Sequence, residues 1–193
     1  MKNNLIKNIV VDAMFLSLFC ALAFSINISV LKFTLQLMIV FIIGLLLPLR
    51  NSLIIIISYI ILGLIGLPIF AGYMGGISYI AMPTFGFVYG FIPGVIVLEL
   101  LKKFFITKTN RKIRILGLFL SCVACQIVCY ICGFIHGYYI LNIQKESGYT
   151  FISLMNLFII PYIPIDILKA IIAILAFIGL ERPYQKIMNN YNN

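Results

Sequence analysis

Long apolar runs joined by short connections are the feature that most constrains how this chain can fold. Six such runs cover residues 9–31, 34–47, 52–67, 85–101, 115–140 and 151–180. The chain is 63% hydrophobic and 10% charged, whereas a soluble domain is about half apolar and a quarter charged. Helices satisfy their own backbone hydrogen bonds inside a lipid bilayer. We therefore predict an all-α membrane protein with six transmembrane helices, forming a single domain over residues 1–193.

Basic residues are distributed unevenly among the connections. The chain carries a net charge of +9, and six Lys and Arg residues fall between residues 102 and 114. Others lie near the two ends of the chain, whereas Lys32 and Lys145 fall in the alternate connections. Because Lys and Arg mark the cytoplasmic side of membrane proteins, we predict that both termini and residues 102–114 face the cytoplasm. We therefore interpret the positive charge as a signal of membrane topology and not of nucleic-acid binding.

A segment rich in glycine and proline begins at the end of the third apolar run and extends into the fourth. Residues 66–94 hold seven of the 14 glycines and three of the seven prolines. Irregular backbone at membrane depth is tolerated where it is buried in protein or lines a cavity. The segment also remains apolar and aromatic, with Phe70 and Tyr73 among its rings, whereas an idle outer loop would be polar. We therefore predict a long outer loop that covers a binding pocket, with these aromatic residues in the pocket wall.

Asp166 and Lys169 are the ionisable residues that stand out within the last apolar run. Lys169 lies about 11 residues, or roughly 16 Å of helix, from the end of the run at Leu180. This distance places it far inside a hydrocarbon core about 30 Å thick. Charges at such depth are costly and mark functional sites. Pro161 and Pro164 precede the pair and predict a helix start there. A ligand carrying a carboxylate and N–H donors would suit this pair; the alternative is a salt bridge that fixes helix packing.

Other polar residues in the apolar runs point to less specific roles. Gln36 and Gln126 are predicted either to line a cavity or to hydrogen-bond across helices, and His136 to pack at the membrane interface. Four cysteines, at positions 122, 125, 129 and 132, resemble a metal motif. In a helix, however, the outer two would lie roughly 15 Å apart, too far to share one zinc ion. We predict a packing face and no metal site.

The first apolar run carries small residues every fourth position, at Ala13, Ser17, Ala21 and Ser25. Such a stripe allows another helix to approach closely, either within this chain or on a partner subunit. The chain contains no phosphate-binding loop ending in Lys-Ser or Lys-Thr and no His-Glu-x-x-His motif. We therefore predict that the protein is not an enzyme.

Three ordered motifs resemble the BioY family, the biotin-specific substrate-binding (S) components of energy-coupling factor (ECF) transporters. They are the Gly66–Gly72 stretch with Gly75-Gly76 and Pro83-Thr84, the Thr34-Leu35-Gln36 stretch, and the segment Pro161–Lys169. This chain has Pro164-Ile165-Asp166 where the family usually has Pro-Gly-Asp. The resemblance implies a biotin receptor of the bacterial cytoplasmic membrane that works with a transmembrane coupling (T) subunit and two ATP-binding cassette ATPases. It would need no cofactor of its own, because only the partner subunits use ATP.

The resemblance also implies which residues take part. The expected substrate-binding residues are Asp166, Lys169, Phe70, Tyr73, Gly75, Gly76, Thr84 and Gln36, and the expected T-subunit contacts are Ala13, Ser17, Ala21 and Ser25. The alternatives are an S component for a different small vitamin, an intramembrane enzyme that depends on His136 or on a nucleophilic Ser or Cys, and a scaffold subunit without a ligand.

Overall fold

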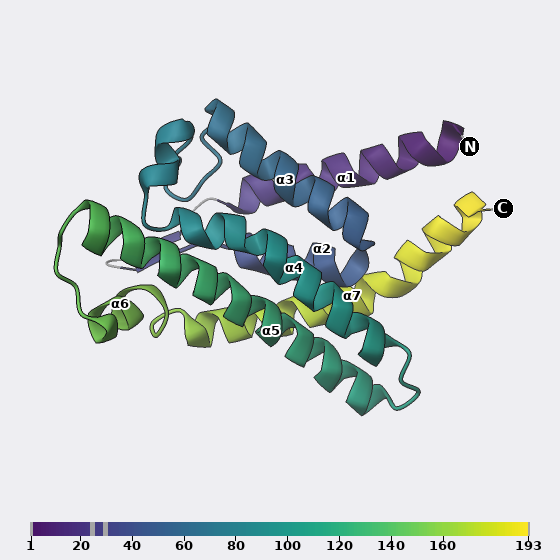
Figure 1. Cartoon of the computed structure of the whole chain (residues 1–193). Helices are drawn as coiled ribbons and strands as arrows, with labels where there is room; N and C mark the ends of the chain where they lie inside the picture. Colours follow the sequence, from purple (N-terminus) through teal and green to yellow (C-terminus); the bar gives the residue numbers. More distant parts are fainter. Residues whose placement is uncertain (1, 24–25, 29–30, 193) are drawn as a thin grey trace.

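The computed structural model of the chain, which describes residues 2–23, 26–28 and 31–192, is built almost wholly from helices (Figure 1). The α-helices are α1 (Lys2–Leu22), α2 (Gln36–Leu46), α3 (Leu49–Ile65), α4 (Phe85–Ile106), α5 (Arg111–Tyr138), α6 (Phe151–Phe158) and α7 (Ile163–Asn192). The remaining elements are the strands β1 (Ile26–Ile28) and β2 (Leu31–Phe33), the 3-10 helix η1 (Ile77–Ala81) and the π-helix η2 (Tyr139–Gln144).

The long helices alternate in direction along one axis. Both ends of the chain and the connection between α4 and α5 lie at one end of the bundle, whereas η1 with its loop and the connection between α5 and α6 lie at the other (Figure 1). The loop-rich end therefore gathers segments that are far apart in the sequence.

Helix α2 occupies the centre of the bundle. All but one of its residues are buried, and it contacts α7, α4, α1 and α3. A helix that is apolar on every side belongs in a protein interior. Its 11 residues extend only about 16 Å, so it is the shortest of the predicted spans and is surrounded by longer helices.

Between α1 and α2 the structure departs from the expected continuous helix over residues 9–31. Helix α1 ends at Leu22, and β1 pairs with β2 in an antiparallel hairpin that matches Ile26 with Phe33. The alternation Ile26-Asn27-Ile28 has the two-residue period of a strand, and isoleucine favours strands. The change from a helical to a two-residue period was missed because it does not alter the hydrophobic content of the run.

Glycines of α4 bring this helix close to α5. Helix α4 begins at Phe85, as predicted for the fourth span, and Gly86, Gly90 and Gly94 form a stripe with four-residue spacing on its surface. A Cβ atom at Gly90 would lie 2.9 Å from the Cβ atom of Cys132, and one at Gly94 would lie 2.8 Å from the Sγ atom of Cys129. The cysteine stripe of α5 is thus a packing face, as predicted from its spacing.

The last apolar run forms two helices, as the helix start predicted near Pro161 and Pro164 indicates. Helix α6 ends at Phe158 and α7 begins at Ile163. Pro161 falls in the break, and Pro164 occupies the first turn of α7, where its missing N–H costs nothing. By length and composition, three helical segments could cross a membrane: Phe85–Ile106, Arg111–Gln144 and Phe151–Glu181. The helical segments Ile9–Leu22, Gln36–Leu46 and Leu49–Ile65 are apolar but shorter.

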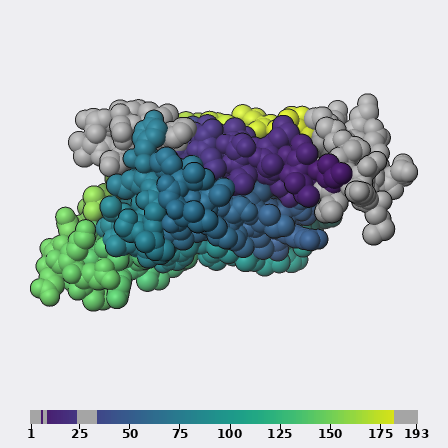
Figure 2. Space-filling model, turned by 90° about the horizontal axis from the view of Figure 1, so that it is seen from above, coloured from purple at the N-terminus to yellow at the C-terminus, as the bar shows by residue number. Residues whose placement is uncertain are grey.

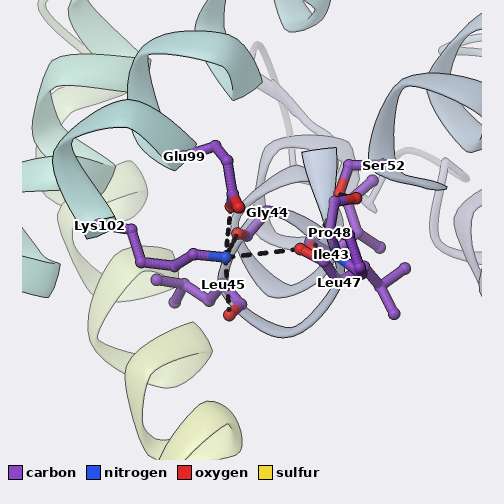
Figure 3. Close-up of polar contacts among 8 residues, drawn as sticks. All are labelled: Ile43, Gly44, Leu45, Leu47, Pro48, Ser52, Glu99 and Lys102. Atoms are coloured by element: carbon purple, nitrogen blue, oxygen red, sulfur yellow. Dashed lines mark hydrogen bonds and ion pairs between the residues drawn. The ribbon is translucent and has the colours of Figure 1, made fainter. Parts of the chain in front are cut away.

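Lys102 fixes the C-terminal end of α2 from the neighbouring helix α4. Its Nζ atom donates to the carbonyl oxygens of Gly44, Leu45 and Leu47 at 2.8, 3.3 and 3.4 Å and forms an ion pair with Glu99 (Figure 3). Both charged residues are buried. The three-residue spacing of Glu99 and Lys102 is typical of an exposed pair on a helix surface, whereas here the pair is buried between α4 and α2. The last carbonyls of a helix lack intrahelical partners, and here a lysine from another helix supplies them.

Candidate functional site

A cavity of about 450 Å³ lies toward the loop-rich end of the bundle, between α2, α4, α5, α6, α7 and the segment around η1. Its lining residues are Thr34, Gln36, Leu37, Ala71, Met74, Tyr79, Met82, Pro83, Thr84, Phe87, Val88, Phe91, Cys129, Tyr130, Leu141, Tyr149, Leu157, Phe158, Tyr162, Asp166 and Lys169. Within this described lining, Asp166 and Lys169 carry the formal charges. A mostly apolar wall with a few convergent polar groups is typical of a small-molecule site.

Asp166 and Lys169 form an ion pair at the start of α7. The Lys169 Nζ atom lies 2.6 Å from Asp166 Oδ1, and each residue is only 5% exposed. Three residues apart on a helix, they share one face, which here borders the cavity. The sequence correctly indicates that these residues lie together in the first turns of a helix; their part in binding stays a prediction.

Tyr130 of α5 also binds Asp166, and sequence reasoning missed it. Its hydroxyl group donates to Asp166 Oδ2 at 2.6 Å and accepts a hydrogen bond from Gln126 Nε2 at 2.9 Å. Gln126 itself does not line the cavity, so it supports the wall from behind. The available signal was two polar residues four positions apart in an otherwise apolar helix, which places them on one face.

Gln36 connects the cavity to the Gly-rich loop through Tyr59 of α3. The amide nitrogen of Gln36 donates to the Tyr59 hydroxyl group, which in turn donates to the backbone carbonyl of Ile69 at 2.8 Å. Tyr59 is fully buried, and its ring stacks on Phe19 of α1 with centroids 4.2 Å apart. A polar side chain predicted to line a cavity or to bond across helices therefore does both.

The loop itself supplies Tyr79 and Thr84 to the cavity wall. Their side-chain oxygens lie 3.4 Å apart, and the Tyr79 ring stacks on Phe70 with centroids 4.5 Å apart. Burial raises the pKa of Tyr79, although the contact with Thr84 partly opposes this shift. The Tyr79 hydroxyl group therefore stays protonated at neutral pH, able to donate as well as accept a hydrogen bond.

Four other loop residues predicted to bind substrate do not line the cavity. Phe70 is fully buried behind the wall, where a Cβ atom on Gly63 would lie 2.2 Å from its ring. Tyr73 is 63% exposed and has a positive φ of 61°. Gly75 approaches the Leu67 carbonyl so closely that an added Cβ would lie 2.2 Å away. Gly76 has a φ of 95°, and its N–H donates to the Gly63 carbonyl at 2.7 Å. These residues therefore shape the loop and do not form the cavity wall. A pattern of glycine and aromatic residues in the sequence does not distinguish residues that line a cavity from residues that support a loop.

His136 holds the same loop from the side of α5. Its Nε2 atom lies 3.1 Å from the carbonyl oxygen of Ile80 and 3.2 Å from that of Met82, and the ring packs edge-on to Phe85 and Tyr89. It does not line the cavity, in keeping with the packing role expected for it. In the part of the chain that the structure describes, no group of three or more His, Cys, Asp or Glu side chains could hold a metal ion.

The small-residue stripe of α1 lies on the surface of the molecule. Ala13, Ser17 and Ala21 are exposed, and Ser17 turns its hydroxyl group back to the Ala13 carbonyl at 2.8 Å. Ser25, the fourth predicted member, lies outside the described residues. Figure 2 shows α1 in purple along one face of the molecule, and the same helix packs against α3. The described part of the stripe is therefore not used for packing inside this chain.

Comparison with known proteins decides the family. The sequence model of the BioY family matches residues 1–186. The chain belongs to the BioY family. The biotin transporter BioY of Thermotoga maritima is 29% identical over 159 residues, which cover 82% of this chain and 85% of that protein. A probable biotin transporter BioY of Lysinibacillus sphaericus is 41% identical over 92 residues, which cover 47% of this chain and 46% of that protein.

A solved structure agrees with this BioY assignment at the level of the whole fold. The crystal structure of the S-component for biotin from an ECF-type ABC transporter has a TM-score of 0.74 and 25% sequence identity, with 94% of each chain covered. The resemblance that the three sequence motifs indicate is therefore confirmed, and BioY proteins are transport proteins and not enzymes.

Proposed function

We propose that this BioY protein is the biotin-binding S component of an ECF-type uptake transporter in the bacterial cytoplasmic membrane. The observation that carries the proposal is the buried Asp166–Lys169 pair in the wall of a mostly apolar cavity of about 450 Å³. The biotin transporters among its relatives support the same substrate. The protein would capture biotin outside and release it inward when coupled to a T subunit and two ATPases.

Biotin suits the chemistry of this cavity. Its ureido group places a carbonyl oxygen beside N–H donors, its bicyclic body is apolar, and its side chain ends in a carboxylate. Lys169 donates and Asp166 accepts, and their charged atoms lie 2.6 Å apart, so one ureido group can meet both residues at once. The alternative docking, with the biotin carboxylate on Lys169, uses only the cationic member of the pair. We favour the ureido arrangement for this reason.

The apolar wall must contribute much of the affinity. A hydrogen bond to a charged group contributes about 1.5–3 kcal/mol, whereas nanomolar binding requires about 12 kcal/mol. The charged pair alone therefore leaves most of this free energy to burial of the bicyclic body. Phe87, Val88 and Phe91 of α4 and Leu157 and Phe158 of α6 provide apolar surface for it.

Titration calorimetry on the purified protein tests the proposal. We expect wild-type protein to bind biotin without ATP, because the cavity belongs to this chain. Lys169→Ala should weaken binding at least tenfold, and Asp166→Asn by a similar or smaller factor. Lys145→Ala is the matched control, because Lys145 is exposed in the connection before α6. Unchanged affinity in folded Lys169→Ala would make this lysine structural, and tighter binding of another vitamin would replace the substrate.

The transport role adds an arrangement in the membrane. We propose six transmembrane segments with both termini in the cytoplasm, which places the cavity near the outer surface. The alternating direction of the helices supports this topology, because both chain ends and the α4–α5 connection share one end of the bundle (Figure 1). The exposed stripe of Ala13, Ser17 and Ala21 would contact the T subunit.

A further inference from the structure

The carboxylate of Asp166 is held by two donors from two helices. Lys169 approaches Oδ1 at 2.6 Å and Tyr130 approaches Oδ2 at 2.6 Å. Each carboxylate oxygen can accept more than one hydrogen bond. With one donor fixed on each oxygen, the carboxylate plane is set, and acceptor capacity remains for a molecule in the cavity that Asp166, Lys169 and Tyr130 line together.

Gln126 fixes the direction of the Tyr130 hydroxyl group. Gln126 is 4% exposed, and its Nε2 atom donates to the Tyr130 oxygen at 2.9 Å. The single hydroxyl proton is then directed at Asp166. If the amide were turned around, its oxygen would compete for that proton, and two acceptors would face each other across the 2.6 Å contact between Tyr130 and Asp166. The described amide orientation is therefore the one that an ionised Asp166 requires.

This directional chain leaves Tyr130 without a proton for the ligand. Its hydroxyl group accepts from Gln126 and donates to Asp166, so the polar head of a ligand meets a fixed acceptor at this part of the wall. A buried site built to accept a hydrogen bond rejects analogues that lack the donor, because its own polar group is then left unpaired.

From this geometry we propose that Tyr130, oriented by Gln126, is a positioning residue that holds Asp166 as an acceptor and makes the cavity selective for ligands with N–H donors. The inference rests on the proposed function, because biotin is the ligand used to test it. Tyr130 does not act as a proton donor to biotin. It acts through Asp166, joining α5 to α7 beside the site.

The test compares biotin with a biotin analogue methylated on a ureido nitrogen, by titration calorimetry. Tyr130→Phe removes the donor to Asp166 but keeps the ring. We expect at least tenfold weaker biotin binding, and a smaller ratio between the affinities for biotin and the methylated analogue than in wild type. Gln126→Leu should also weaken biotin binding and lower the ratio between the two affinities, but by smaller amounts. Added to Tyr130→Phe, it should change affinity by less than threefold, because Gln126 acts only through Tyr130.

Tyr89→Phe is the matched control, since the Tyr89 hydroxyl group donates to the Cys132 carbonyl at 3.4 Å and Tyr89 does not line the cavity. It should leave both affinities unchanged. If Tyr130→Phe weakens both ligands equally, so that their ratio is that of wild type, Tyr130 is merely structural and the inference is wrong. Should Tyr130→Phe fail to fold, the ratio measured on Gln126→Leu decides in the same way. Failure of wild-type protein to bind biotin would instead remove the proposed substrate, and the inference with it.

Discussion

Replacing Lys102 with methionine tests how α2 is held in the centre of the bundle. The side chains of Lys102 and Glu99 are 9% and 7% exposed, and Lys102 also serves three carbonyl groups at the end of α2. Lys102→Met keeps the apolar stem but leaves Glu99 as a buried charge without its partner. Removal of one partner from a buried ion pair costs about 3–5 kcal/mol. For a chain of this size, about 2–4 °C per kcal/mol gives a fall of roughly 6–20 °C in melting temperature.

The neighbouring residues supply controls for this prediction. Lys103→Met removes an exposed lysine from the same helix and should change stability by no more than about 0.5 kcal/mol. Glu99→Gln keeps an oxygen near Lys102, and the lysine keeps its three carbonyl acceptors. This variant should therefore lose no more than the about 1.5–3 kcal/mol of one charged hydrogen bond. Adding Glu99→Leu to Lys102→Met should recover part of the loss, because no unpaired charge remains.

The measurement is a thermal melt of the ligand-free protein in detergent, followed by intrinsic tyrosine fluorescence. Wild-type protein and Lys103→Met should melt at the highest temperature, Glu99→Gln at a lower temperature, and Lys102→Met at the lowest. If Lys102→Met melts within about 2 °C of Lys103→Met, the end of α2 is held by its apolar contacts alone, and the reasoning from the buried pair is refuted.

Two further predictions concern the membrane and the partner subunit. Ala13→Trp or Ala21→Trp should abolish biotin uptake with the T subunit yet leave biotin binding intact. The control Met14→Trp, at another exposed position of α1, should change uptake less. Normal uptake by Ala13→Trp and Ala21→Trp would exclude this stripe as the contact. A single cysteine at position 108, in a background without native cysteines, should react with impermeant maleimide only after the cell membrane is opened. Labelling of intact cells would reverse the proposed orientation.

Helix positions were predictable from the sequence because their cause is local. The apolar runs and Pro161 locate the starts of helices α3 to α7 to within about four residues, since they depend on composition and on residues that cannot continue a helix. The end of α7 at Asn192 lies 12 residues beyond the predicted end of the last run at residue 180. The strand pair after α1 was not recognised, because a short two-residue period inside a long apolar stretch does not alter its hydropathy. Likewise, the sequence alone does not show whether a glycine such as Gly90 permits a loop or the close approach of two helices.

From residue spacing alone, the candidate site was predictable only where its residues are neighbours on one helix, whereas Gln36 and Thr84, which also line the cavity, were expected from the family motifs. Asp166 and Lys169 are three positions apart, so helix geometry alone brings them together. Tyr130 reaches Asp166 only because α5 packs beside α7, and Tyr59 reaches Gln36 only because α3 returns past α2; neither contact has a counterpart in sequence spacing. A polar residue in an apolar helix is costly unless it has a partner, so each buried Gln was itself a signal that a second polar group lay nearby. Gln36 and Gln126 each indicate such a partner, and in this fold both partners are tyrosines whose hydroxyl groups pass the hydrogen bond onward, one to the loop over the cavity and one to the acidic residue within it.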